Sequence, residues 1–219
     1  MYNITLISTN HSESGKCNSD ELYKIIESIN PETIFEELSS KRFDDYYNGN
    51  LTYASLEVKC IKKYLQTHST NHLPVDIANP NRPSNEILMF EEFEKDAEYK
   101  KLKYEHNLLK AQKGFDYLNS DKCTDLVEKW IRTEKRILES ATYKDIFLHS
   151  YELFYEDVDN RENAMLQNIY NYSKENRFNH AVFLLGSAHR KSIMQKITEF
   201  EKLSEIRLNW TIYGNKQKT

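Results

Sequence analysis

The segment "HAVFLLGSAH" limits the fold of this chain more than any other part of its sequence. Residues 181–185 are all apolar, which is typical of a β-strand that other elements cover on both faces. Such strands belong to parallel sheets whose connections are helices. A helical pattern, "RKSIMQKITEFEKL", follows directly, and the β-rich segment "IRLNWTIYG" comes after it. This end of the chain therefore predicts a strand, a helix and a second strand of an α/β sheet.

The beginning of the chain shows the same alternation. Its patterns predict a strand over residues 4–8, a helix over 20–30, a strand over 33–38, a helix over 51–66 and a strand over 73–77. Asn18 or Ser19 could cap the first helix. Residues 85–176 instead carry apolar side chains at helical spacing among many charges. The sequence thus predicts an α/β (α+β) fold in one domain, 1–219. A mostly parallel central sheet is flanked by helices, and residues 85–176 form a helical insertion between its third and fourth strands.

Composition bounds the class of protein and its environment. Of the 219 residues 39% are hydrophobic and 29% are charged, as in a soluble globular protein. No stretch approaches the ~20 apolar residues of a membrane span, and a net charge of −4 argues against a general nucleic-acid binder. The N-terminus has no signal-peptide pattern, and the three cysteines have no metal-binding spacing. A cytoplasmic protein with reduced thiols is expected, and an oligomer is compatible with the sequence.

Polar residues stand at the ends of the first four predicted strands. They are Thr9, Asn10 and His11 for the first, Glu36 and Glu37 for the second, Asp76 for the third, and Gly186, Ser187 and His189 for the fourth. In a parallel sheet these positions meet at one edge, so two histidines and at least two carboxylates would lie together. Such groups suit Zn²⁺, Mn²⁺, Fe²⁺ or Co²⁺ and general acid–base chemistry. The competing interpretation, that polar residues stand there only because strands end at the surface, stays open.

Other residues near these strands receive simpler interpretations. Gly186 is expected to allow a sharp backbone turn. The tetrapeptide STNH of residues 8–11 recurs at 69–72, but the second copy precedes its strand, so His68 and His72 are expected in a surface loop at the opposite edge of the sheet. His149 is expected to be a buried, hydrogen-bonded core histidine. Ser187 is a weak candidate nucleophile because the G-x-S-x-G elbow is absent.

Four short motifs resemble, in order, those of a known superfamily. The first, "LISTNH", is similar to a strand with a G-x-x-H motif, and the second, "TIFEELSSKRF", is similar to a strand ending in E-L-x-x-x-R, with Glu37 and Arg42. The third, "RENAMLQNI", is similar to an R-[ND]-x-x-M-x-x-N-I helix, with Arg161, Glu162, Met165 and Asn168. The fourth, "VFLLGSAHRKSI", is similar to a second G-x-x-H, with Gly186 and His189. With these motifs the chain resembles a divergent member of the Tiki/TraB superfamily, which also includes erythromycin esterase-like and ChaN-like haem-uptake proteins. Ser8 stands at the place of the first motif's glycine.

The resemblance implies a pocket that serves either hydrolysis or binding. For hydrolysis of an ester or peptide bond, His11, Glu37 and His189 would hold a divalent metal (Mn, Zn, Fe or Co), or His11 or His189 would act as general base without one. Arg161 would orient the substrate or stabilise an oxyanion, or form a structural ion pair. Alternatively, the pocket would bind haem, a peptide or another small ligand without catalysis. A third hypothesis is a protein that acts through its helical insertion and has a vestigial site.

Overall fold

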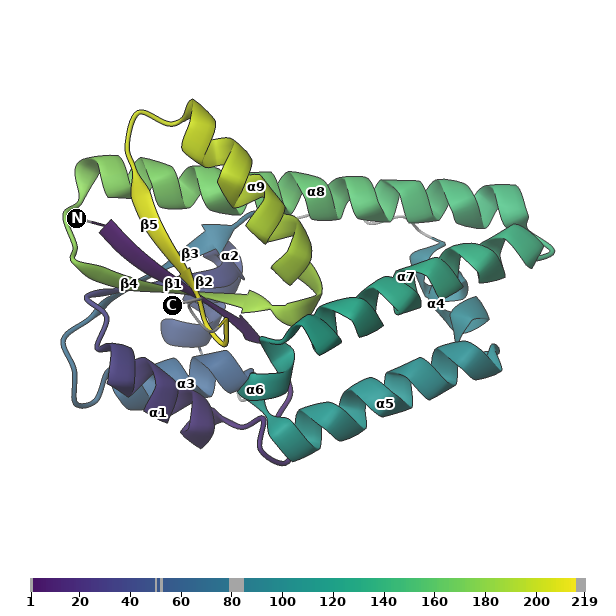
Figure 1. Cartoon of the computed structure of the whole chain (residues 1–219), viewed down its shortest axis with the longest axis horizontal. Helices are drawn as coiled ribbons and strands as arrows, with labels where there is room; N and C mark the ends of the chain where they lie inside the picture. The colour runs from purple at the N-terminus through teal and green to yellow at the C-terminus, as the bar shows by residue number, and fades with distance from the viewer. Residues whose placement is uncertain (1, 50, 52, 79–84, 216–219) are drawn as a thin grey trace.

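Five parallel strands form the central sheet of this computed structural model (Figure 1). The structure describes residues 2–49, 51, 53–78 and 85–215. The strands are β1 (Tyr2–Thr9), β2 (Thr33–Ser39), β3 (Asn71–Asp76), β4 (His180–Gly186) and β5 (Leu208–Ile212), in the spatial order β3-β2-β4-β1-β5. The apolar strand β4 lies in the middle and pairs with both β1 and β2. The predicted α/β fold with a parallel sheet is therefore confirmed.

Helices cover both faces of the sheet. Four of them are α1 (Ser19–Ile29), α3 (Leu56–Tyr64), α8 (Lys144–Glu175) and α9 (Arg190–Leu203). Val182 and Leu184 of β4 share an apolar cluster with α1 and α3, whereas Phe183 and Leu185 share another with α8 and α9. The side chains of β4 thus alternate between two covered faces, as its continuous apolar sequence predicts.

The order of the strands places a ligand-binding edge near the middle of the sheet. The connections from β1 to β2 and from β2 to β3 run over the face that α1 and α3 cover. The connection from β3 to β4 also contributes residues to that face before it crosses the opposite face as α8, and the last connection follows on the opposite face as α9. Because the direction of winding reverses, β4 enters between β2 and β1. Open α/β sheets bind ligands at the carboxyl ends of the strands beside such a reversal.

Local sequence signals account for the helix boundaries. Asn18 caps α1 as predicted, with its Oδ1 accepting a backbone N–H at 2.9 Å. The helix expected from residue 51 begins later, because the hydroxyl of Ser55 caps α3. An additional helix, α2 (Ser40–Tyr47), was not predicted. It begins after Ser39, whose hydroxyl accepts a backbone N–H in the first turn.

The segment between β3 and β4 is helical, as predicted. It contains α4 (Glu86–Phe93), α5 (Ala97–Lys113), α6 (Phe115–Leu118), α7 (Asp121–Ser140) and α8. Much of it projects away from the sheet (Figure 1) and has its own apolar cluster, which includes Phe93, Leu138 and Tyr151. The 32 residues of α8 run from this projecting section onto the sheet. Within the described ranges, none of the helices is both long and apolar enough to cross a membrane.

The prediction of a surface-loop position for His72 was wrong. His72 lies inside β3, and its side chain is only 20% exposed. Its Nδ1 lies 2.8 Å from Glu36 Oε1, and its ring packs against Phe43 and Tyr47. Because β3 begins at Asn71, earlier than expected, this histidine becomes part of the sheet.

The prediction for His149 was also wrong. This residue is exposed on α8. The buried side of the helix at this point consists of residues 147, 150 and 151, and the helical repeat turns His149 away from them.

Candidate functional site

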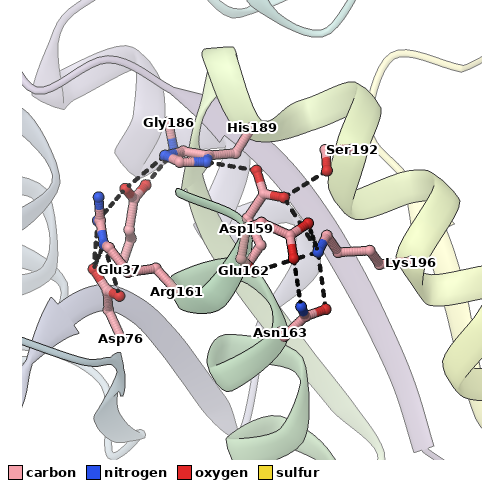
Figure 2. Close-up of polar contacts among 10 residues, drawn as sticks. All are labelled: Glu37, Asp76, Asp159, Arg161, Glu162, Asn163, Gly186, His189, Ser192 and Lys196. Carbon is pink, nitrogen blue, oxygen red and sulfur yellow. Dashed lines mark hydrogen bonds and ion pairs between the residues drawn. The ribbon is translucent and has the colours of Figure 1, made fainter. Parts of the chain in front are cut away.

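A network of charged side chains joins the carboxyl ends of β2, β3 and β4 to α8 (Figure 2). Glu37 lies at its centre. Its Oε2 accepts a hydrogen bond from Gly186 N (2.6 Å), and its Oε1 lies 3.3 Å from both His189 Nε2 and Arg161 Nη2. Arg161 also pairs with Asp76, with 2.5 Å between Nη2 and Oδ2. The structure thus places three of the four predicted site residues, Glu37, Arg161 and His189, in direct contact.

His189 lies between two carboxylates. Its Nδ1 is 2.8 Å from Oε1 of Glu162, and its Nε2 faces Glu37. Glu162 is 1% exposed and also accepts a hydrogen bond from the hydroxyl of Ser192. Burial lowers the pKa of His189, but hydrogen bonds to Glu162 and Glu37 outweigh burial and raise this pKa to about 9. The ring is therefore a cation at neutral pH, and both of its N–H groups are engaged.

Glu37 is held as a carboxylate by its surroundings. Burial alone would raise its pKa, but His189, the charge of His11 and the N–H of Gly186 together lower the pKa to about 2. Alternation along β2 explains why this residue, and not its neighbour, faces the site. The neighbour, Glu36, instead accepts hydrogen bonds from Tyr47 and lies against His72.

The role predicted for Gly186 needs correction. Its φ of −54° and ψ of 134° are open to any residue, so the turn here does not require glycine. A Cβ atom at this position would, however, lie 3.2 Å from Glu37 Oε2 and 3.7 Å from His189 Cδ2. Glycine therefore leaves room for the Glu37 carboxylate to reach the backbone N–H of residue 186.

His11 forms a pair with a carboxylate that the sequence did not indicate. Its Nδ1 lies 3.2 Å from Oε1 of Glu57, in the first turn of α3. Thr9 Oγ1 donates to the same oxygen at 2.7 Å, and the N–H of Leu56 donates to the carbonyl of His11. A hydrogen bond to the carboxylate of Glu57 raises the pKa of His11 to about 9, so this ring, like that of His189, is a cation at neutral pH. The His11 side chain is 65% exposed, and its Nε2 has no hydrogen-bond partner in the described part of the chain.

The predicted site residues line a cavity of about 580 Å³. At the sheet its lining consists of Thr9, Asn10, His11, Ser12, Glu37, Gly186, Ser187, Ala188 and His189. Arg161 of α8 completes the polar side. The opposite walls come from α4, α5, α7 and α8 and contain Phe90, Tyr99, Trp130, Phe154 and Tyr155. A ligand with an apolar part against these rings and a polar part at the sheet would match this lining.

The hydrogen bonds of the network decide whether these residues fit a metal ion. A ligating histidine must offer a lone pair, but both ring nitrogens of His189 face carboxylates. Both oxygens of Glu37 are likewise engaged. Among the residues described, no group of three or more His, Cys, Asp or Glu side chains could hold a metal ion. The arrangement therefore does not fit a metal, and the ligand role predicted for His11, Glu37 and His189 would require these contacts to break.

The sequence analysis did not identify two further residues in the region of the cavity. Glu57 stands in the first turn of a helix, where acidic residues are common. Lys110 lines the cavity, but α5 also carries several exposed lysines, from which the sequence does not distinguish it. Neither position carries a motif. Glu162, in contrast, lies in the "RENAM" motif, and only its contact with His189 was not foreseen.

Known proteins add no further information about this site. Comparisons of the chain with family models, curated proteins and solved structures found no match. The resemblance to the Tiki/TraB superfamily therefore stays a prediction.

Proposed function

We propose that the protein is a hydrolase of ester or peptide bonds in which His11 is the general base. The pairing of His11 with Glu57 at the cavity carries this proposal. Once the ring loses a proton, above its pKa of about 9, the carboxylate would hold the remaining proton on Nδ1, which leaves Nε2 to accept a proton in the cavity. A small-molecule or peptide substrate and a cytoplasmic location belong to the same proposal.

The residues of the site suggest how the reaction would proceed. Nε2 of His11 would take a proton from a water molecule as the water oxygen attacks the carbonyl carbon. Arg161 would stabilise the developing oxyanion, since its Nε and Nη2 are bound by Asp76 and Glu37 whereas its Nη1 has no partner among the described residues. The protonated His11 would then donate its proton to the leaving oxygen or nitrogen. Glu37 acts through Arg161 in this scheme and is a positioning residue.

The first test compares wild-type protein with His11→Ala on a panel of 4-nitrophenyl esters and fluorogenic peptides. We expect kcat/KM to fall by about 10² to 10⁴, the usual contribution of a general base. His149→Ala is the matched control, because this histidine is exposed on α8 and is not among the cavity-lining residues. Equal turnover by wild type and His11→Ala on every cleaved substrate would contradict the proposal.

The pH dependence gives a second readout of the same pair. Because a general base must be unprotonated, kcat/KM should rise with pH up to and through about pH 9, as His11 loses its proton. Glu57→Gln removes the carboxylate that raises the pKa of His11, so its pH profile should shift to lower pH while its maximal rate falls. A purely structural role of Glu57 would lower the rate without this shift.

The metal-dependent version of the hydrolase has its own test. Stoichiometric Mn, Zn, Fe or Co in protein purified without an affinity tag, lost in His189→Ala, would support a metal site. Unchanged activity and stability after treatment with chelators would contradict it.

A non-catalytic binding protein is the second candidate function, and the aromatic lining of the cavity favours it. If the ligand is haem, the axial ligand should be His11, because Nε2 of this residue has no hydrogen-bond partner in the described ranges, whereas both nitrogens of His189 are engaged. Titration with haem should then produce a Soret band that is lost in His11→Ala and kept in His149→Ala. A titration without a Soret band would contradict haem binding.

A further inference from the structure

Lys110 is a buried lysine that has no carboxylate partner among the residues the structure describes. It belongs to α5, is 5% exposed and lines the same cavity as His11. Its Nζ donates a hydrogen bond of 3.1 Å to Oδ1 of Asn10. In the part of the chain that the structure describes, no carboxylate oxygen forms an ion pair with this ammonium group. A neutral amide is thus the one polar partner that the described residues provide.

Lys196 shows what a buried lysine ordinarily requires. It is 8% exposed, forms an ion pair with Asp159, and lies 3.8 Å from Oε2 of Glu162. Buried charges are costly unless an opposite charge compensates them. Lys196 meets this requirement within the protein, and Lys110 does not.

None of the groups that the structure describes around Lys110 forms an ion pair with it. Oε1 of Glu57 is shared by Thr9 and His11, its Oε2 is buried without a hydrogen-bond partner among the described residues, and neither oxygen forms an ion pair with Lys110. His106, one turn earlier on α5, is neutral at pH 7, because burial and the charge of Lys110 lower its pKa to about 4. An anion entering the cavity would therefore gain a charge-assisted hydrogen bond that no protein group supplies.

The position next to Lys110 can also hold the second oxygen of a carboxylate. Asn10 lines the cavity, and its Oδ1 accepts from Lys110 and from Ser12. Its Nδ2 has no partner among the described residues and is a free donor. Beyond these groups lie the aromatic rings of Tyr99, Trp130 and Tyr155, against which a flat apolar group would pack.

We infer that the cavity binds an aromatic carboxylate, with the carboxylate paired to Lys110 and Asn10 and the ring against the aromatic walls. The inference rests on the proposed function in that it names the substrate class of the same cavity: an ester or amide whose acyl or leaving group carries this anion. Binding at equilibrium tests it without any turnover, so it can hold where hydrolysis fails.

The experiment measures the binding of three matched probes by isothermal titration calorimetry. They are 3-phenylpropanoate, its neutral amide and 3-phenylpropylammonium. Wild-type protein should bind the carboxylate roughly tenfold or more tightly than the amide, in line with a hydrogen bond between charged groups. Lys110→Gln should remove this preference. Lys101→Gln, at an exposed position of the same helix, should keep it.

Further variants keep the result interpretable. Lys110→Arg retains the charge and should retain most of the preference, and thermal denaturation of each variant shows whether it is folded. If Lys110→Gln does not fold, the comparison of the three probes on wild type and Lys110→Arg decides. Equal affinities for carboxylate and amide, a preference that survives in Lys110→Gln, or tighter binding of the ammonium probe would each overturn the inference. Binding without hydrolysis of any such ester would leave it standing and would contradict the proposed function.

Discussion

Ser8 is fully buried near the end of β1, and its hydroxyl finds no hydrogen-bond partner in the part of the chain that the structure describes. The superfamily that the chain resembles has glycine at this place, but the backbone here does not need one. Among the described residues, Asn30 is the one residue other than glycine with a positive φ. Ser8 therefore introduces no backbone strain, and its cost is a buried polar group without a partner.

Ser8→Ala should stabilise the protein. Removal of the unpaired hydroxyl leaves the strand and its packing in place, so the free energy of unfolding should rise by up to about 1 kcal/mol. Chemical denaturation measures this change. Ser173→Ala is the matched control: this serine is equally buried, but its hydroxyl donates to Ile169 O at 2.7 Å, so its removal should stabilise nothing. A loss of stability in Ser8→Ala would contradict the interpretation.

At the scale of elements, Asn119 connects the helical section to the end of β1. It lies between α6 and α7 and is fully buried. Its Oδ1 accepts from Ser8 N at 2.7 Å, and its Nδ2 donates to Ser8 O at 3.0 Å. The strand β5 pairs with β1 only as far as Leu6, apart from one more bond from Tyr213 N. Beyond the end of β5, the side-chain amide of Asn119 thus makes the hydrogen bonds with Ser8 that a neighbouring strand would make. These bonds lie just before the loop that carries His11.

Asn119→Ala should destabilise the protein by roughly 2 to 4 kcal/mol, because it leaves the buried N–H and C=O of Ser8 without partners. Thermal and chemical denaturation measure the loss. Asn171→Ala is the control, since Asn171 is exposed on α8 and bonds only Gln167. A variant as stable as this control would show that water satisfies the Ser8 backbone.

The sequence could predict which residues lie at the strand ends, but not which helix side chains face the cavity. Strand ends are fixed by topology, so Glu37, Asp76 and the loop of Gly186 could be expected at one edge. Side chains on helices also depend on the rotation of each helix about its axis. On α5 the apolar residues Tyr104 and Leu108 are 69% and 41% exposed, whereas Lys110 is buried. Hydrophobic spacing predicted that helix but not which face meets the cavity, and Lys110 was missed for this reason.

At the scale of the whole molecule, the network of Glu37, His189 and Glu162 makes stability depend on pH. The pKa of His189 is about 9 in the folded protein and near 6.5 in a free side chain. A raised pKa contributes stability that is fully present below about pH 6.5 and is lost as the pH rises through 9. Glu37, whose folded pKa is about 2, contributes stability above its ordinary pKa of 4.5 and loses it as the pH falls toward 2.

The free energy of unfolding should therefore decrease between about pH 6.5 and 9, by up to about 3 kcal/mol from His189 alone. Denaturation curves across this range measure the slope. His189→Gln should be less stable at pH 6 and should show a smaller slope. His149→Gln, changed at an exposed position, should keep the slope of the wild type. A slope that is the same in His189→Gln and wild type would assign the effect to other groups, such as His11, whose pKa Glu57 likewise raises from 6.5 to about 9.

The unbroken course of α8 has a consequence for how a ligand enters. One helix carries Phe154 and Tyr155 of the aromatic walls, Arg161 and Glu162 of the charge network, and the residues that pack on the sheet. Because a continuous helix moves as a rigid body, a tilt of its projecting half would pull Arg161 away from Glu37 and Asp76. The opposite wall is joined to the same helix, because Glu134 of α7 accepts hydrogen bonds from Tyr151 and Tyr155 of α8. A movement of the projecting section that admits a ligand should therefore also move Arg161, so that α8 couples ligand entry to the charge network.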